Sequence, residues 1–142
     1  MGKSTTFEND LLKLIFNGTP ITGLADNAAS SPITSLYISL HTANPESGNQ
    51  TTSETAYTGY ARLPLVRSTS GWTVTGSSVS PVSAVEFGEC TASPGAQIQY
   101  AAIGTALSGT GKILYSGLLS TAITMAVGVA PRIKTTSTIT ED

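Results

Sequence analysis

Residues 36–41 read Leu-Tyr-Ile-Ser-Leu-His, and this stretch decides the fold class. Leu36, Ile38 and Leu40 occupy every second position, with polar or aromatic residues between them. Side chains alternate between the two faces of a β-strand, so this period of two predicts a strand with one buried face. Similar short pieces, divided by Gly and Pro, follow along the rest of the chain.

The further strands are expected within residues 60–67, 71–87, 97–103, 112–115, 121–129 and 132–140. Pro64 removes a backbone donor and therefore favours an edge strand or a bulge within residues 60–67. Short strands with turn signals about every eight to twelve residues are typical of antiparallel sandwiches. We therefore predict an all-β, antiparallel β-sandwich similar to a jelly roll, with about eight short strands and one N-terminal helix.

The N-terminal residues have helical periodicity instead. Thr5 and Glu8 have the spacing of a capping box, and Gly18 is suited to end the helix. The helix has an apolar stripe formed by Phe7, Leu11, Leu14 and Ile15 and widened by Leu12 and Phe16. A helix this short needs a surface to pack on, either in this chain or in another subunit. Residues 17–32, rich in Gly, Pro, Asn, Ala and Ser, are predicted to form an extended arm. The predicted division is thus residues 1–32, helix and arm, and residues 33–142, the β-sandwich domain.

Composition excludes several classes of protein. Charged residues make up 11% of the 142 residues, and 18 Ser and 22 Thr must cover much of the surface instead. The net charge of −2, with no basic run, argues against a nucleic-acid partner. One His and one Cys cannot form a His/Cys metal site or a disulfide framework, and no cofactor is expected. No signal peptide or membrane-spanning stretch is readable, which favours a chain without a membrane partner that folds in a reducing cytoplasm.

Few residues offer chemistry. His41 ends a strand at the mouth of a long polar loop, residues 42–58, where a catalytic residue could lie, but no nucleophile motif accompanies it. A hydrogen-bonded or solvated His41 is therefore the preferred interpretation. Glu46 and Glu54 do not have a spacing that distinguishes a catalytic pair from chance, and Cys90 has no neighbouring cation to activate it. The Gly-rich residues 104–112 predict a hairpin turn, because the context of a phosphate-binding loop is missing.

The aromatic residues are few, so their positions matter for predicting contacts. Tyr57 and Tyr60 lie at the end of the long loop, which is long enough to be either functional or mobile. Trp72 is more readily explained as a core residue than as an interface anchor. The predicted protein interface consists of three helical and two loop residues: Phe7, Leu11, Ile15, Tyr57 and Tyr60.

Three segments together resemble a family of small tailed-bacteriophage virion proteins, catalogued as tail-fibre-like and similar to capsid decoration, or cement, proteins. They are LYISLHTANP (36–45), TGYARLPLVRSTSGWTVTG (58–76) and AAIGTALSGTGKILYSG (101–117). The resemblance implies a non-enzymatic structural protein of the virion, assembled in the bacterial cytoplasm, and it covers most of the chain after Pro32.

The choice between head and tail is made on physical grounds. A fibre is expected to be long and repetitive, whereas this chain is short and has no repeat, so we expect a cement protein. It would bind the outer surface of the major capsid protein as a homodimer or homotrimer through many small contacts. The first alternative is a tail-fibre or tail-tip protein whose loop binds a host glycan, and the second is a hydrolase that uses His41.

Overall fold

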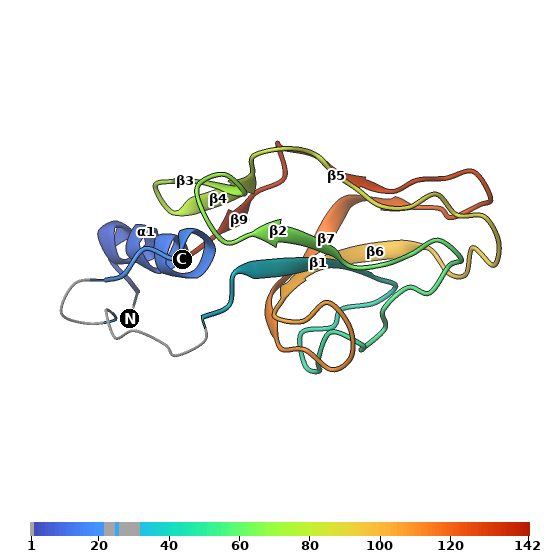
Figure 1. Cartoon of the computed structure of the whole chain (residues 1–142), viewed down its shortest axis with the longest axis horizontal. Coiled ribbons are helices and arrows are strands. Elements are labelled where there is room, and N and C mark those ends of the chain that lie inside the picture. Colours follow the sequence, from blue (N-terminus) through green and yellow to red (C-terminus); the bar gives the residue numbers. More distant parts are fainter. Residues whose placement is uncertain (1, 22–24, 26–31) are drawn as a thin grey trace. The chain divides into compact units, whose positions relative to one another are not determined.

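The structure, a computed structural model, describes residues 2–21, 25 and 32–142 (Figure 1). Nine strands and one α-helix are present in this part of the chain. The helix α1 (Thr5–Leu12) continues into a π-helical turn, η1 (Lys13–Asn17). The strands are β1 (Ser35–His41), β2 (Leu63–Val66), β3 (Trp72–Thr75), β4 (Ser78–Pro81), β5 (Val85–Glu86), β6 (Ile98–Gly104), β7 (Ile113–Ile123), β8 (Arg132–Ile133) and β9 (Ile139–Thr140).

All of the strand pairings with a defined register are antiparallel, as predicted for an all-β fold with one N-terminal helix. The strands form sheets with the orders β2-β1-β6-β7, β3-β4-β9 and β5-β8. The strand predicted at residues 36–41 is β1, and its alternating apolar residues Leu36, Ile38 and Leu40 are at most 2% exposed. The fold class is therefore confirmed.

The chain divides into two compact units. The first unit contains residues 1–35, 65–84 and 134–142, and the second contains residues 36–64 and 85–133. The sequence predicts a single boundary between residues 32 and 33, and this division stays a prediction. Most of the predicted extended arm, residues 22–24 and 26–31, lies outside the described residues.

In the first unit, the helix packs on the sheet β3-β4-β9. Leu12 and Phe16 are fully buried, and the Phe16 ring meets the Trp72 ring edge-on with the centroids 4.8 Å apart. Trp72 is 2% exposed, as expected of a core residue. The Arg67 guanidinium donates to the carbonyl oxygens of Leu14 and Ile15, so a cation satisfies acceptors at the negative end of the helix. The helix is thus held to its own chain at both its apolar face and its C-terminal end.

The helix begins one residue earlier than predicted. Ser4 is the N-cap, and its hydroxyl oxygen accepts from the Phe7 N–H at 3.3 Å. A capping box needs Glu or Gln at the residue that is here Phe7, so the predicted pair of Thr5 and Glu8 does not form one. Gly18 ends the helix as predicted, with φ of +66°, a left-handed conformation that glycine adopts without strain.

Two predicted strands at the C-terminal end are wrong in extent. Residues 121–129 were expected to form one strand, but β7 ends at Ile123 and the chain then turns at Gly128, whose φ is +91°. The alternation of Ile123, Met125, Val127 and Val129 predicts one buried face, but Val127 is 66% exposed. Residues 132–140 contain two separate strands, β8 and β9, which pair with different sheets because a turn closed by Lys134 and Ser137 divides them.

In the second unit, the core surrounds β1 and β6. Ile38 pairs with Ile103 and Ser39 with Ala102, and all four are at most 6% exposed. Further buried residues come from the loop after β1, from β5 and from the segments that follow β5 and β7; they include Tyr57, Val85, Phe87, Cys90 and Met125. This unit contains the long loop and therefore the candidate site.

Candidate functional site: a loop braced from inside

The connection between β1 and β2, which we call the long loop, spans residues 42–62 and so extends four residues beyond the predicted 42–58. It starts by folding back along β1. Glu54 forms an antiparallel bridge with His41, and the Thr55 N–H donates to the Leu40 carbonyl at 3.0 Å. The returning segment therefore pairs with the last two residues of β1. The sequence had left open whether this loop is functional or mobile, and the structure gives it a defined path.

Short-range hydrogen bonds shape the turns of the long loop. The Asn49 side-chain oxygen accepts from the Thr51 N–H at 2.9 Å, and the Asn44 side-chain oxygen accepts from the Glu46 N–H at 3.1 Å. Asn and Asp side chains commonly form such turns because their side-chain oxygen accepts a hydrogen bond from the backbone N–H two residues further along the chain. The Thr52 hydroxyl accepts from the Asn49 N–H at 3.1 Å. The polar residues of the long loop thus specify a sequence of turns.

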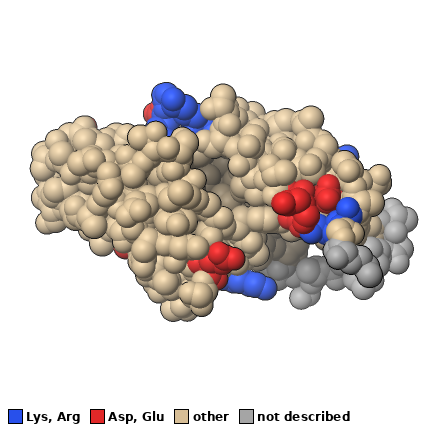
Figure 2. All heavy atoms as spheres, turned by 180° about the vertical axis from the view of Figure 1, so that it is seen from behind, with Lys and Arg blue, Asp and Glu red and all other residues tan. Residues whose placement is uncertain are grey.

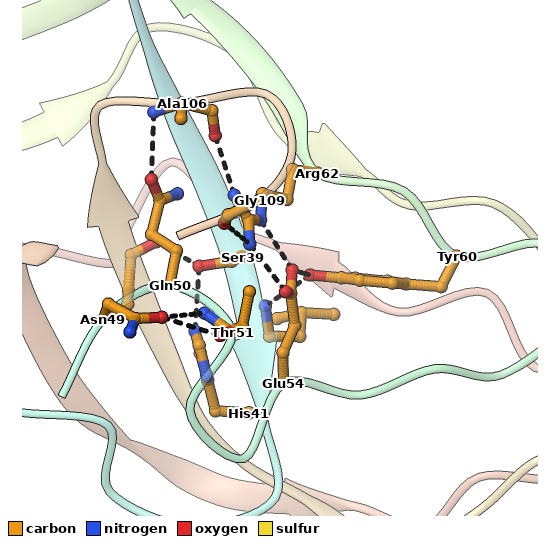
Figure 3. Close-up of polar contacts among 12 residues, drawn as sticks. Ser39, His41, Asn49, Gln50, Thr51, Glu54, Tyr60, Arg62, Ala106 and Gly109 are labelled. Atoms are coloured by element: carbon orange, nitrogen blue, oxygen red, sulfur yellow. Dashed lines mark hydrogen bonds and ion pairs between the residues drawn. The ribbon is translucent and has the colours of Figure 1, made fainter. Parts of the chain in front are cut away.

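A buried ion pair holds the end of the long loop (Figure 3). Arg62 donates from Nε to one Glu54 carboxylate oxygen and from Nη2 to the other, both at 2.7 Å. The Tyr60 hydroxyl donates to the same carboxylate at 2.8 Å and accepts from the Leu40 N–H at 3.1 Å. The Arg62 side chain is 3% exposed and that of Glu54 15%. This fork geometry fixes the orientation of both side chains as well as their separation.

The same guanidinium reaches a second loop. Arg62 also donates to the Ala106 carbonyl at 3.0 Å and to the Gly109 carbonyl at 2.8 Å. Both belong to the loop between β6 and β7, residues 105–112, which we call the β6–β7 loop. The hydrogen bonds to Glu54 raise the pKa of Arg62 above its ordinary value, so the guanidinium stays charged. One buried cation therefore joins the two loops.

Gln50 forms a second connection between the loops. The Gln50 side-chain oxygen accepts from the Ala106 N–H at 2.9 Å, and the Gln50 backbone N–H donates to the Gly111 carbonyl at 2.9 Å. A Cβ added at Gly104 or at Gly111 would come within about 2 Å of the Gln50 amide, at 2.1 Å and 2.0 Å respectively. Only glycine leaves room for this fully buried side chain. The close approach makes the two glycines part of the site.

His41 lies beneath the long loop and is fully buried. Its Nε2 lies 2.8 Å from the Ser39 hydroxyl, and its Nδ1 lies 2.8 Å from the Thr52 carbonyl oxygen. An acceptor at Nδ1 requires a proton there, so in the neutral ring Nε2 accepts from Ser39. Burial lowers the pKa of His41, and this favours that neutral form. The interpretation of His41 as a hydrogen-bonded residue is confirmed. Ser39 is fully buried as well, so neither side chain of the pair is accessible to a substrate in this structure.

The predicted interface residues have different environments. Tyr57 is 2% exposed and its hydroxyl donates to the Gly88 carbonyl at 2.9 Å, so it is a core residue of the second unit. Tyr60 is half-buried and bound to Glu54. Phe7, Leu11 and Ile15 are each half-buried on the helix. Their assignment to a protein interface stays a prediction.

The structure gathers Ser39, His41, Glu54, Tyr60 and Arg62, of which the sequence had singled out three as candidates. Arg62 and Gln50 were missed as site residues. Alternation along residues 60–67 predicts that Ala61 shares a face with Leu63 and Leu65 and that Arg62 lies on the opposite face, whereas in the structure Ala61 is exposed and Arg62 is buried. The only available signal was that an acidic and a basic residue, Glu54 and Arg62, occur close together in a chain with little charge.

The described residues contain no group of three or more His, Cys, Asp or Glu that could hold a metal ion. No helix in the same part of the chain is long and apolar enough to span a membrane. Antiparallel sheets with loops fixed by buried polar side chains define a class of small β-protein that presents rigid loops on a stable scaffold.

Comparison with known proteins identifies the family. A family model described as "Podophage GP4 fiber I protein gp80" matches residues 2–140. The chain belongs to this family, and membership supports a structural protein of a tailed-phage virion, located in the virion. A search of curated proteins found no match.

Proposed function

We propose that the protein is a fibre-associated component of the phage tail that takes part in attachment to the host. The observation that carries the proposal is the match of nearly the whole chain, residues 2–140, to a family described as a fibre protein. This description favours a location on the tail. The short chain without repeats had instead suggested the capsid surface.

The braced loops support a role in contact with another molecule. Leu107 lies on the β6–β7 loop and is 56% exposed, although Arg62 and Gln50 bind the backbone on either side of it. A loop that is already ordered loses less conformational entropy when it binds. Buried side chains of the second unit therefore fix the backbone that carries this exposed apolar side chain.

The surface chemistry limits the kind of contact. Charged residues make up 11% of the sequence, and on the face in Figure 2 they form a few small clusters among uncharged described residues. Long-range electrostatic attraction to a partner is accordingly weak, and affinity must come from hydrogen bonds and apolar contacts. We expect binding to depend little on salt.

Co-sedimentation tests the location. Purified protein is mixed separately with tailless heads and with headless tails from particles that lack it, at low and at high salt. We expect saturable binding to tails in both conditions. Saturable binding to heads and none to tails would overturn the proposal and favour a capsid decoration protein that binds the major capsid protein.

Attachment is tested with phage that carry Leu107→Asp. We expect slower adsorption to host cells, while Val127→Asp, at a residue 66% exposed, serves as the matched control. Normal adsorption with Leu107→Asp would remove the β6–β7 loop from the proposal, even if the protein is located on the tail.

A further inference from the structure

One face of the sheet β3-β4-β9 consists of hydroxyl side chains alone. Thr73 lies opposite Ser80 in the register of β3 and β4. Ser78 lies opposite Thr75 on one side and opposite Thr140 on the other. Residues that pair across antiparallel strands lie on the same side of the sheet, and so do alternate residues of one strand. These five residues therefore share one face, which we call the hydroxyl face.

The helix covers the opposite face of the same sheet (Figure 1). The strand residues of that face are all apolar: Trp72, Val74, Val79, Pro81 and Ile139. Trp72 and Val79 are at most 2% exposed, and the Trp72 ring contacts Phe16. The hydroxyl face consequently points away from the helix, and Thr73, Thr75 and Thr140 are exposed.

The hydroxyl groups of this face are largely free to bind another molecule. Those of Thr73, Thr75 and Ser80 have no hydrogen-bond partner within the part of the chain that the structure describes. The Ser78 and Thr140 hydroxyl oxygens lie 3.4 Å apart, so one donates to the other. A Ser or Thr hydroxyl can donate one hydrogen bond and accept two. The face thus offers donors and acceptors side by side without any charge.

Two exposed apolar side chains adjoin the hydroxyl face. The Val82 N–H donates to the Gly71 carbonyl at 3.0 Å, so the pairing of β3 with β4 continues one step to these residues. A Cβ added at Gly71 would lie 3.2 Å from the Val66 Cγ1, so the Val66 side chain lies against Gly71. Val66 and Val82 are 46% and 45% exposed. An apolar pair therefore lies at one end of the hydroxyl face.

Size and charge limit what can bind there. Three strands about 4.8 Å apart and at most four residues long cover roughly 200 Å². A stable protein interface buries about 800 Å² on each partner, so the face is too small to hold a second copy of the chain. Nucleic acids and other polyanions are bound through Lys and Arg, and this face has neither. A small uncharged ligand that is rich in hydroxyl groups fits both limits.

We propose that the hydroxyl face binds an uncharged polysaccharide. Sugar hydroxyls donate and accept hydrogen bonds as Ser and Thr do, and the C–H groups of sugar rings pack on apolar side chains such as Val66 and Val82. A polymer presents the same unit many times, which raises the apparent affinity of a small contact. The site belongs to the first unit, whereas the β6–β7 loop belongs to the second. Binding in solution is independent of whether the protein belongs to the tail or the head.

Affinity electrophoresis of the full chain tests the proposal, in native gels that contain dextran, mannan or galactan. We expect at least one of these neutral polymers to retard the protein to the same extent at low and high salt, and anionic alginate not to retard it. Thr73→Val should weaken the retardation about two- to tenfold, the value of one hydrogen bond, and Thr73→Val with Thr75→Val should weaken it further. Valine keeps the β-branched shape, and Trp72 fluorescence in a melt verifies that the variants fold.

The matched control is Thr121→Val, which removes an exposed hydroxyl from β7 and should leave the retardation unchanged. Equal retardation of the wild type and the double variant would overturn the proposal, as would a wild type that none of the three neutral polymers retards. Retardation that Leu107→Asp abolishes and the double variant retains would assign the polysaccharide to the β6–β7 loop instead. A dimer in sedimentation that Thr73→Lys dissociates would assign the face to a second copy.

Discussion

Replacing Arg62 by Met should destabilise the second unit by removing the connection between its two loops. Met has a similar length but cannot donate, so the change removes two hydrogen bonds to Glu54 and those to the Ala106 and Gly109 carbonyls. The Glu54 carboxylate then remains without its counter-charge. Loss of one partner from a buried ion pair costs about 3–5 kcal/mol.

The lower end of that range applies here. The Glu54 side chain is 15% exposed, so water offsets part of the cost, and the Tyr60 hydroxyl still donates to it. We expect the free energy of unfolding to fall by about 3 kcal/mol for Arg62→Met. For a chain of this size this corresponds to a fall in Tm of about 6–12 °C.

The assay must follow the second unit. The single tryptophan, Trp72, belongs to the first unit, so its fluorescence reports unfolding there. Hydrogen exchange of the Ala106 and Gln50 backbone amides, read by NMR or mass spectrometry, reports the loops directly, because both amides donate hydrogen bonds between the two loops. We expect the Ala106 amide, which donates to Gln50, to lose protection before the residues of β1 do.

Two comparisons isolate the ion pair. Arg132→Met breaks an ion pair with Glu86 in which the side chains are 52% and 69% exposed, and it should cost less than about 1 kcal/mol. Glu54→Gln combined with Arg62→Met should be less destabilised than the sum of the single variants, because the two side chains interact. An Arg62→Met variant as stable as Arg132→Met would refute the bracing role.

Three further predictions concern fit, pH and the helix. Gly104→Ala should cost about 1–3 kcal/mol in chemical denaturation, whereas Gly117→Ala, whose added Cβ meets nothing within 4 Å, should cost much less. Burial lowers the pKa of His41 below 6.5, so as the pH falls the unfolded chain is protonated at His41 before the folded chain is, and the free energy of unfolding should fall below about pH 6.5. The free energy of unfolding of His41→Asn should fall less steeply between about pH 7.5 and 5.5, and an unchanged slope would contradict this prediction. Ser4→Ala should lower stability by about 1 kcal/mol in a melt followed by tryptophan fluorescence, and an equal loss with Thr5→Ala would argue against the observed cap.

The fold class was predictable because a period of two is a direct consequence of strand geometry. Leu36, Ile38 and Leu40 are buried as that period requires. The same pattern was misleading at residues 121–129, where it continues by chance through the end of β7 and into a turn at Gly128. Periodicity records which side chains are apolar, but it does not show where backbone hydrogen bonding stops.

The helix was predictable as an element but its role was not. The buried residues Leu12 and Phe16 lie at one side of the predicted stripe, against β3, while Phe7 and Leu11 remain half-buried. The helix therefore belongs to a folded unit, and a variant without residues 1–17 would expose Trp72. The sequence shows that a helix needs a surface, but not which surface it uses.

The candidate site was predictable only in part, because its contacts join residues far apart in the chain. Arg62 bonds residues 44 and 47 positions away, at Ala106 and Gly109, and Gln50 bonds a residue 56 positions away. A general preference places arginine at the surface. Only the three-dimensional approach of Glu54 and two backbone carbonyls makes its burial favourable.

Two contacts of the C-terminal residues determine how the first unit responds to mechanical force: Glu141 forms an ion pair with Lys3 near the other end of the chain, and β9 pairs with β4. A pull applied at residues 3 and 141 is carried by these contacts and by the helix packed on β3 and β4. The second unit consists of residues 36–64 and 85–133, and both segments are preceded and followed by residues of the first unit, so a pull at residues 3 and 141 does not stretch it until the first unit opens. Tension between these two residues would thus leave the hydrogen-bonded loops of the second unit intact while the first unit holds.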